Sequence, residues 1–553
     1  MSTEVGKKQC IKKNVLRILF FIILSFCYIY FFTNSTGQAI IKANIDGEFH
    51  ISRILSLENI FNSPVNFKYF AHTGQIVNLM YPWVLVYPMY LLYKLTNDVV
   101  LAYYLYFTII TFVTLELTYY CSKKMKQSTL GAMLVAVLYS FSMVRTSDIY
   151  FRMAIGEVLG ITFFPLVLLG IYQIFYEKKP KWIALTLGMT LLVYSHVISV
   201  VLASLLILMF FFINILRKKI NKERLLALLK ATGMTLLLGL GFLLPMLQML
   251  ISVDISKPVV YNLFQAALKP NDLISKSISN EVSSVITFNF VYIVLIVILL
   301  FNLKKIKGFC RDTLLLGTIF TIMSTTLFPW DVFQNLLHVI QFPWRLIGIA
   351  SLLLAFSFGS LFGNFVNQSH HNKKRLQLFA MTICCIVLCH FGTLDMIGNI
   401  NGLNNGDTSE KFVKEVSKNP NFNGLDDYAP KDAGYDLQFI HDQKICANAS
   451  WHSVKIKRTA NKVIYKYDSP NATTAFLPVF YYPGEVVKQN GDRIFVQKAQ
   501  DGATLVNLKE GENTFEVSFE YTKLAKASWT ISLISFVVLC GYLIFKKKRV
   551  LAN

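Results

Sequence analysis

The chain has 553 residues, of which 54% are hydrophobic and only 16% are charged, with 45 Phe and 27 Tyr. This composition excludes a soluble multidomain protein and is typical of a polytopic membrane protein. The net charge of +22 does not indicate a nucleic-acid partner, because residues 396–527 carry 16 basic and 16 acidic side chains. The whole excess therefore lies among the hydrophobic segments.

Seven basic clusters flank alternate apolar runs of about 20 residues, the length that a helix needs to cross a bilayer. Since cytoplasmic loops keep the positive charge, these clusters, which hold 27 Lys and Arg, are predicted to face the cytosol. The N-terminal run is interpreted as a retained anchor. The pattern predicts about twelve transmembrane helices, with both termini cytoplasmic, at residues 15–33, 99–121, 128–145, 156–176, 182–195, 197–215, 225–247, 285–302, 312–328, 346–363, 376–395 and 528–545.

The segment 79–95 is also apolar enough to cross the bilayer, but counting it would reverse the orientation of every later loop. It contains Pro82, Pro88 and many Tyr, which suit an interfacial helix. We therefore expect it to lie on the outer surface, within an outer loop at 34–98.

The polar segment 396–527 is predicted to be an external domain, because the last span follows it and ends in basic residues. Alternation in "NTFEVSFEYT" and a two-residue turn at Asn490-Gly491 favour strands, and a β-sandwich is expected. The chain then divides into a transmembrane module at 1–395, this domain, and a final helix with a basic cytoplasmic tail at 528–553.

Polar side chains gather at the outer ends of the predicted spans. A charge inside a span costs about 3 kcal/mol or more, so such residues are usually functional. The candidate catalytic residues are Asp46, Glu48 and His50, and the candidate substrate-binding residues are Arg53, Asp148, Arg152, Glu157, His196, Trp344 and Arg345.

A helix through the first outer loop would place Asp46, His50 and Arg53 on one face, at spacings of four and three residues, and Glu48 on the opposite face. The alternative is that Asp46 only caps the helix. The other residues also have structural interpretations: an ion pair between Arg152 and Glu157, a hydrogen-bonding role for the hairpin His196, and an interfacial anchor at Trp344-Arg345.

These residue types suit one kind of chemistry. A carboxylate can deprotonate an acceptor hydroxyl or hold a divalent metal. Arginines bind phosphate groups with bidentate geometry, and aromatic rings can stack on sugar faces. Because nucleotide sugars are not available outside the cell, sugar transfer from a polyprenyl phosphate fits this set of residues without a soluble cofactor.

The patterns "DGEFHISRI", "YP", "RMAIGE", "YSH", "QFPWR" and "FLPVFYYPGEVV" together resemble a family of large bacterial membrane proteins labelled "6-pyruvoyl-tetrahydropterin synthase-related". The architecture of that family looks like that of the GT-C glycosyltransferases. The resemblance implies a GT-C-like helical membrane protein with an external C-terminal β-rich domain, located in the bacterial cell membrane.

In the GT-C superfamily an acidic residue in the first outer loop acts with polyprenyl-phosphate sugars, and Asp46 resembles that acid. The acidic pair of the superfamily is often adjacent, whereas a glycine separates Asp46 from Glu48 here. This leaves open whether Glu48 takes part, and whether a divalent metal (Mg²⁺ or Mn²⁺) is held by Asp46. Asp148 and Glu157 are candidates for a second acid from another loop.

The resulting hypothesis is a glycosyltransferase that moves a sugar from a polyprenyl-phosphate donor to a cell-envelope glycopolymer or glycolipid on the outer face. The first alternative is a transporter or a flippase for lipid-linked sugars, which usually shows internal repeats and charges in mid-membrane. A non-catalytic envelope scaffold is the second, and it predicts that Asp46 tolerates substitution.

Overall fold

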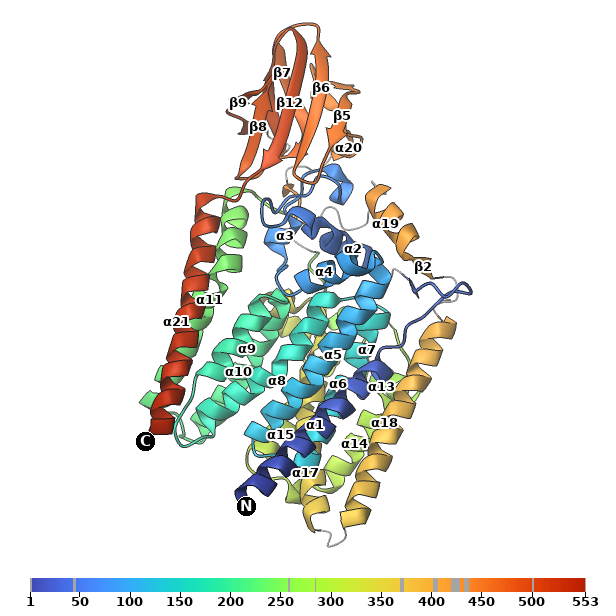
Figure 1. Cartoon of the computed structure of the whole chain (residues 1–553), viewed down its shortest axis with the longest axis vertical. Coiled ribbons are helices and arrows are strands. Elements are labelled where there is room, and N and C mark those ends of the chain that lie inside the picture. Colours follow the sequence, from blue (N-terminus) through green and yellow to red (C-terminus); the bar gives the residue numbers. More distant parts are fainter. Residues whose placement is uncertain are drawn as a thin grey trace. The chain divides into compact units, whose positions relative to one another are not determined.

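The computed structural model describes residues 2–42, 46–256, 259–283, 285–368, 372–400, 406–418, 428–431, 437–499 and 502–552. Contacts divide the chain into two compact units, and Figure 1 labels their elements. Unit 1 comprises Met1–Gly47, Val100–Thr235 and Val260–Ser409, and unit 2 comprises Glu48–Val99, Leu236–Val259 and Glu410–Asn553. This division differs in kind from the domain boundaries expected from charge and hydropathy, at 1–395, 396–527 and 528–553, and those boundaries stay a prediction.

Unit 1 is helical apart from β1 (Ile40–Ile41) and β2 (Asp407–Thr408), which pair in antiparallel fashion. Its longer helices are those whose apolar runs stand out in the sequence. The helices wholly or mostly in unit 1 are α1 (Ser2–Tyr28), α5 (Val99–Lys124), α6 (Thr129–Ser140), α7 (Met143–Tyr150), α8 (Ile155–Phe175), α9 (Ile183–Val193), α10 (Val197–Leu216), α12 (Leu263–Ala266), α13 (Pro270–Ile278), α14 (Phe290–Phe301), α15 (Phe309–Met323), α16 (Trp330–Leu337), α17 (Leu346–Gln368) and α18 (Asn372–Ile400).

Among the described residues, eight helices are long and apolar enough to cross a membrane. They coincide with eight predicted spans and are Val99–Lys124, Thr129–Tyr150, Ile155–Phe175, Val197–Leu216, Lys222–Ser252, Pro343–Val366, Leu376–Gly398 and Lys523–Lys548. The predicted spans 182–195 and 285–302 fold as the shorter apolar helices α9 and α14. The chain is thus a polytopic helical protein, and the count of twelve spans stays a prediction.

Glycines set how closely the helices of unit 1 approach one another. A Cβ on Gly170 of α8 would lie 2.5 Å from the backbone of Leu185 in α9. A Cβ on Gly131 of α6 would lie 2.5 Å from the carbonyl oxygen of Gly359 in α17. Small residues at such crossings are typical of membrane helices, whose association depends on close packing.

Asp312 joins three helices of unit 1. The side chain of Asp312 is fully buried. Its carboxylate accepts hydrogen bonds from both terminal nitrogens of Arg217, at 2.5 and 2.6 Å. The hydroxyl of Tyr176 donates to the same carboxylate at 2.7 Å. The first turn of α15 is therefore tied to the residues that follow α8 and α10.

Arg217→Lys is expected to destabilise the chain by about 1–2 kcal/mol, because a lysine keeps the charge but loses the bidentate fork on Asp312. The measurement is the melting temperature of the purified full chain in detergent. Arg311→Lys, at an exposed neighbouring position, is the control. Equal melting temperatures for Arg217→Lys and the wild type would contradict the expectation.

Unit 2 contains a β-sandwich built from two five-stranded sheets, ordered β10-β11-β7-β3-β4 and β5-β6-β12-β8-β9. The side chains of Phe515, Val517 and Phe519 are buried in its core, which confirms the strand predicted from alternation. Asn490 and Gly491, both with positive φ, connect β8 to β9, which confirms the predicted two-residue turn. The strands are β3 (Ile445–Ala447), β4 (Ser450–His452), β5 (Lys455–Arg458), β6 (Lys462–Ser469), β7 (Thr473–Phe480), β8 (Glu485–Gln489), β9 (Asp492–Ile494), β10 (Gln497–Lys498), β11 (Ala503–Leu508) and β12 (Gly511–Phe519).

The segment after Asp46 belongs to the same unit as the sandwich. Val65 and Phe67 lie in the sandwich core, and Asn59 donates through Nδ2 to the carbonyl of Ala460 at 3.1 Å. The remaining helices of unit 2 are α2 (Gly47–Leu55), α3 (Val77–Met80), α4 (Tyr87–Thr96), α11 (Lys222–Ser252, whose first part lies in unit 1), α19 (Ser409–Lys418), α20 (Leu437–His441) and α21 (Lys523–Ala552). The segment 79–95 thus contains no helix long enough to cross a bilayer, and its predicted surface location stays a prediction.

Glu485 gives the sandwich a pH-dependent stability. Part of the residue is exposed, yet burial of its carboxyl group raises its pKa from 4.5 to about 8, against the effect of the hydrogen bonds from Thr504. Because the folded pKa is raised, this stabilisation is complete below about pH 4.5 and is lost as the pH rises through about 8.

We therefore expect the melting temperature of the full chain to fall between pH 5 and pH 9, and Glu485→Gln to flatten that fall. Glu516→Gln, on the neighbouring strand β12, is the control, because its carboxylate is paired with the exposed Lys462. Thermal scans at stepped pH make the comparison. An unchanged slope in Glu485→Gln would show that another group titrates.

Candidate functional site

The turn between α7 and α8 positions three of the predicted residues in unit 1. Asp148 lies in the last turns of α7, Arg152 lies in the connection, and Glu157 lies in the first turn of α8. Met153 adopts a positive φ of 57°, and Ala154 donates its N–H to the carbonyl of Asp148 at 2.8 Å. This tight reversal brings the two acids to the same arginine.

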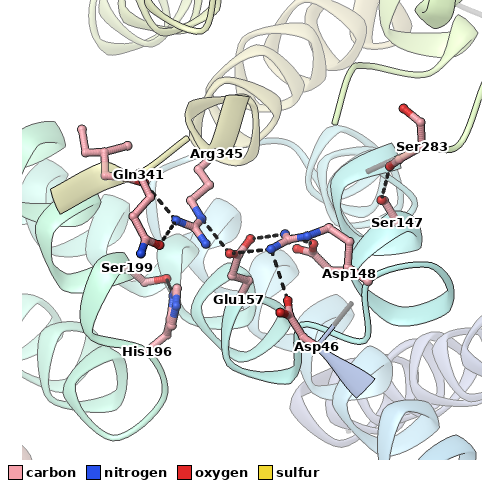
Figure 2. Close-up of polar contacts among 11 residues, drawn as sticks. Asp46, Ser147, Asp148, Glu157, His196, Ser199, Ser283, Gln341 and Arg345 are labelled. Carbon is pink, nitrogen blue, oxygen red and sulfur yellow. Dashed lines mark hydrogen bonds and ion pairs between the residues drawn. The ribbon is translucent and has the colours of Figure 1, made fainter. Parts of the chain in front are cut away.

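Arg152 is the centre of an ion cluster, and Figure 2 labels its partners Asp46, Asp148 and Glu157. Its Nη1 donates to Asp148 Oδ1 and to Glu157 Oε2, each at 2.8 Å, and its Nη2 donates to Glu157 Oε1 at 3.3 Å. Arg345 donates through Nε to the same Glu157 oxygen at 2.7 Å. The side chains of Asp148, Arg152, Glu157 and Arg345 are all at least nine-tenths buried, so the cluster is preorganised and largely dry.

Asp46 is the exposed member of the cluster. Its Oδ2 lies 3.5 Å from Arg152 Nη2, and its N–H donates to the carbonyl of Arg152 at 3.3 Å. About a third of its side chain, 36%, is exposed. Its carboxyl group nevertheless has a raised pKa, because burial outweighs the attraction of Arg152. A carboxylate that is accessible, loosely held and more basic than usual can accept a proton.

Arg345 has one donor group to spare. Besides Glu157, it donates through Nη1 to the carbonyl of Ile340 at 2.9 Å and to Gln341 Oε1 at 2.7 Å. Among the described residues, its Nη2 has no hydrogen-bond partner. The ring of Trp344 lies 5.7 Å from the Arg345 guanidinium and 4.7 Å from that of Arg152. Arg345 can therefore donate to a further acceptor without breaking its existing bonds.

His196 and Gln341 are the other residues of interest near this cluster. His196, directly before α10, shares a hydrogen bond between its Nδ1 and Ser199 Oγ at 3.0 Å. Gln341 has a positive φ of 62° and orients Arg345. Sequence analysis missed Gln341 and Ser199, although Gln341 opens the "QFPWR" pattern.

Glu48, His50 and Arg53 belong to unit 2, on α2, whereas Asp46 belongs to unit 1. Arg53 Nη1 donates to His50 Nδ1 at 3.0 Å, which confirms their shared helix face and leaves that ring nitrogen unprotonated. Arg53 also donates to the carbonyl of Pro82 at 2.7 Å. Burial lowers the pKa of Arg53 to about 10, so it remains charged at neutral pH.

The acids do not fit a metal held by protein ligands alone. Within the part of the chain that the structure describes, no group of three or more His, Cys, Asp or Glu side chains could hold an ion. Asp148 Oδ1 and both oxygens of Glu157 are bonded to guanidinium groups, which leaves Asp46 and the buried Oδ2 of Asp148 as the candidate ligands among the acids of this cluster.

Comparison with known proteins gives little. No protein-family model matches the chain, and no curated protein matches it. Among solved structures, the chain is similar to ArnT from Cupriavidus metallidurans bound to undecaprenyl phosphate, with a TM-score of 0.38 and 9% sequence identity. The match covers 68% of this chain and 64% of ArnT, so the chain spans less than two thirds of that protein. The family resemblance drawn from the sequence stays a prediction.

Proposed function

We propose that this chain is a membrane glycosyltransferase that transfers a sugar from a polyprenyl-phosphate donor to a cell-envelope glycopolymer or glycolipid at the outer face of the membrane. The observation that supports this most is that one cluster contains both a possible base and a possible phosphate-binding group. Asp46 offers an accessible carboxylate, and Arg345 offers an open guanidinium N–H, with Glu157 and Arg152 connecting the two.

Asp46 is the proposed base. It takes the proton of the acceptor hydroxyl as that oxygen forms a bond to the anomeric carbon of the donor sugar. The raised pKa of Asp46 strengthens it as a base, because a carboxyl group closer in pKa to the working pH accepts a proton more readily.

Arg345 is the proposed partner of the leaving group. When the bond between the anomeric carbon and the phosphate oxygen breaks, its electron pair stays with that oxygen, and a singly charged phosphodiester becomes a doubly charged phosphomonoester. A guanidinium that faces the phosphate stabilises the added charge. Trp344 is buried and stacked on Phe342, and the Arg152 guanidinium lies 4.7 Å from its ring, so its proposed part in substrate binding is to hold Arg152 in place.

The remaining residues have supporting roles in this proposal. Glu157 orients both arginines, Asp148 holds Arg152, and His196 is proposed to contact the substrate. The catalytic roles predicted for Glu48 and His50, and the substrate-binding role predicted for Arg53, stay predictions. No step requires a metal, in accordance with the ligand set described above.

The proposal is tested in a host that lacks the protein, complemented at equal membrane abundance with wild type, Asp46→Asn or the control Glu58→Gln, which changes an exposed acid paired with Lys68. The sugar composition of purified wall polymers and membrane glycolipids is compared. We expect a sugar restored by the wild type to be absent with Asp46→Asn. If Asp46→Asn restores every sugar, Asp46 only caps α2 and the transporter or scaffold alternative gains.

A further inference from the structure

The candidate span Thr129–Tyr150 is interrupted, because α6 ends at Ser140 and α7 begins at Met143 (Figure 1). A break inside a membrane segment frees backbone N–H and C=O groups. Since the bilayer core has no water to bind them, these groups need partners within the protein.

The freed acceptors at this break all have donors. The hydroxyl of Tyr292 lies 3.3 Å from the carbonyl of Leu138, and it shares its single proton between this carbonyl and that of Ser351 at 3.1 Å. Arg145 Nη1 donates to the carbonyl of Ser140 at 3.1 Å, and Asn289 Nδ2 donates to that of Phe141 at 3.1 Å. The C-terminal end of α6 is therefore capped by side chains from α7 and from the start of α14.

The donors at the same break are left open. The backbone N–H groups of Met143, Val144 and Arg145, which begin α7, have no hydrogen-bond partner among the described residues. Arg145 Nε and the hydroxyl oxygens of Ser140 and Ser142 also have none within this part of the chain. All five residues are at least 97% buried.

Among the described residues the Arg145 guanidinium forms no ion pair, although Asp148 attracts it electrostatically and the ring of Tyr28 lies 5.1 Å from it. The guanidinium of Arg145 donates only to neutral oxygens, the Ser140 carbonyl and Thr111 Oγ1 at 3.2 Å. The acid on the same helix, Asp148, is bonded to Arg152 instead. The N-terminal end of α7 adds the positive end of its helix dipole. Water could accept these hydrogen bonds as well, whereas an anion would also place a negative charge directly against Arg145.

We infer that the break between α6 and α7 binds a compact inorganic anion, held by the first N–H groups of α7, the hydroxyls of Ser140 and Ser142, and Arg145. Half-helix N-termini that face anionic groups at broken membrane helices are a known arrangement. This site shares no residue with the Asp46 cluster, although Asp148 of that cluster lies on the same helix, α7. The inference is independent of the proposed function.

The test is the melting temperature of the purified full chain in detergent, with sodium chloride, bromide, phosphate or sulfate titrated against sodium gluconate at constant ionic strength. We expect at least one anion to raise the melting temperature of the wild type to a plateau. Ser142→Ala and Arg145→Gln should weaken or abolish the rise. Ser25→Ala is the matched control, because Ser25 is an equally buried serine whose hydroxyl is satisfied within α1.

Bromide also allows a direct observation, since its anomalous scattering would place it against Ser142 and the first turn of α7 in crystals. No response to any of the four anions would overturn the inference, as would an equal response in the wild type, Ser142→Ala and Arg145→Gln. Because Ser142→Ala removes only one oxygen, the test remains decisive even if Arg145→Gln fails to fold.

Discussion

Arg152→Gln is expected to lower the stability of the chain by about 3–5 kcal/mol, because removal of one partner leaves buried charges unpaired. Asp148 is fully buried and bonded to Arg152, and Glu157 would retain only Arg345. Against a typical total stability of about 5–15 kcal/mol, such a loss should sharply lower both the melting temperature and the abundance of the protein in the membrane.

A second substitution separates charge imbalance from lost packing. Asp148→Asn in the Arg152→Gln background removes the carboxylate that is left without its partner, so we expect part of the stability to return. Thermal scans of the single and double variants in one detergent make this comparison. A double variant no more stable than Arg152→Gln would show that the ion pair is not what holds the α7–α8 turn.

Arg345→Gln is expected to lower kcat/KM for the lipid-linked donor by about 30- to 1,000-fold, equivalent to about 2–4 kcal/mol of lost phosphate stabilisation. The argument rests on Nη2 of Arg345, the guanidinium donor group that is open for an anion. Arg345→Lys keeps the charge but not the fork, so its loss should be smaller.

The comparison needs a control for stability, because Arg345 also holds Glu157 at 2.7 Å. Melting temperatures of both variants are measured beside the kinetics, and Trp344→Phe tests the neighbouring ring. Donor and acceptor are varied separately. If Arg345→Gln affects only the acceptor, or neither substrate, Arg345 does not face the donor phosphate.

The sequence predicts the features that depend on local pattern. Charge and hydropathy locate eight long apolar helices, and alternation at 515–519 identifies a central strand of the sandwich. The polar residues around Arg152 can also be selected from the sequence, because charges at span ends are costly. That Arg152 and Arg345 share Glu157 could not be read from spacing, since the two arginines lie far apart in the chain.

Other features depend on contacts that no local signal encodes. The break after Ser140 lies in a run without Gly or Pro, and its carbonyls are capped by Tyr292 and Asn289 from a distant segment. The inclusion of Val65 in the sandwich core likewise depends on tertiary packing. Sequence analysis therefore predicted neither the anion site nor the grouping of residues 48–99 with the sandwich.

The most direct test of the central claim is transfer by the purified full chain in nanodiscs, supplied with lipid extracts and envelope polymer from the host that lacks the protein. Sugar incorporated into polymer is measured against pH for the wild type and for Asp46→Asn. The account predicts that kcat/KM falls at low pH, with an apparent pKa above that of an ordinary aspartate, and that Asp46→Asn is inactive at every pH. Transfer by Asp46→Asn at the rate of the wild type would contradict it.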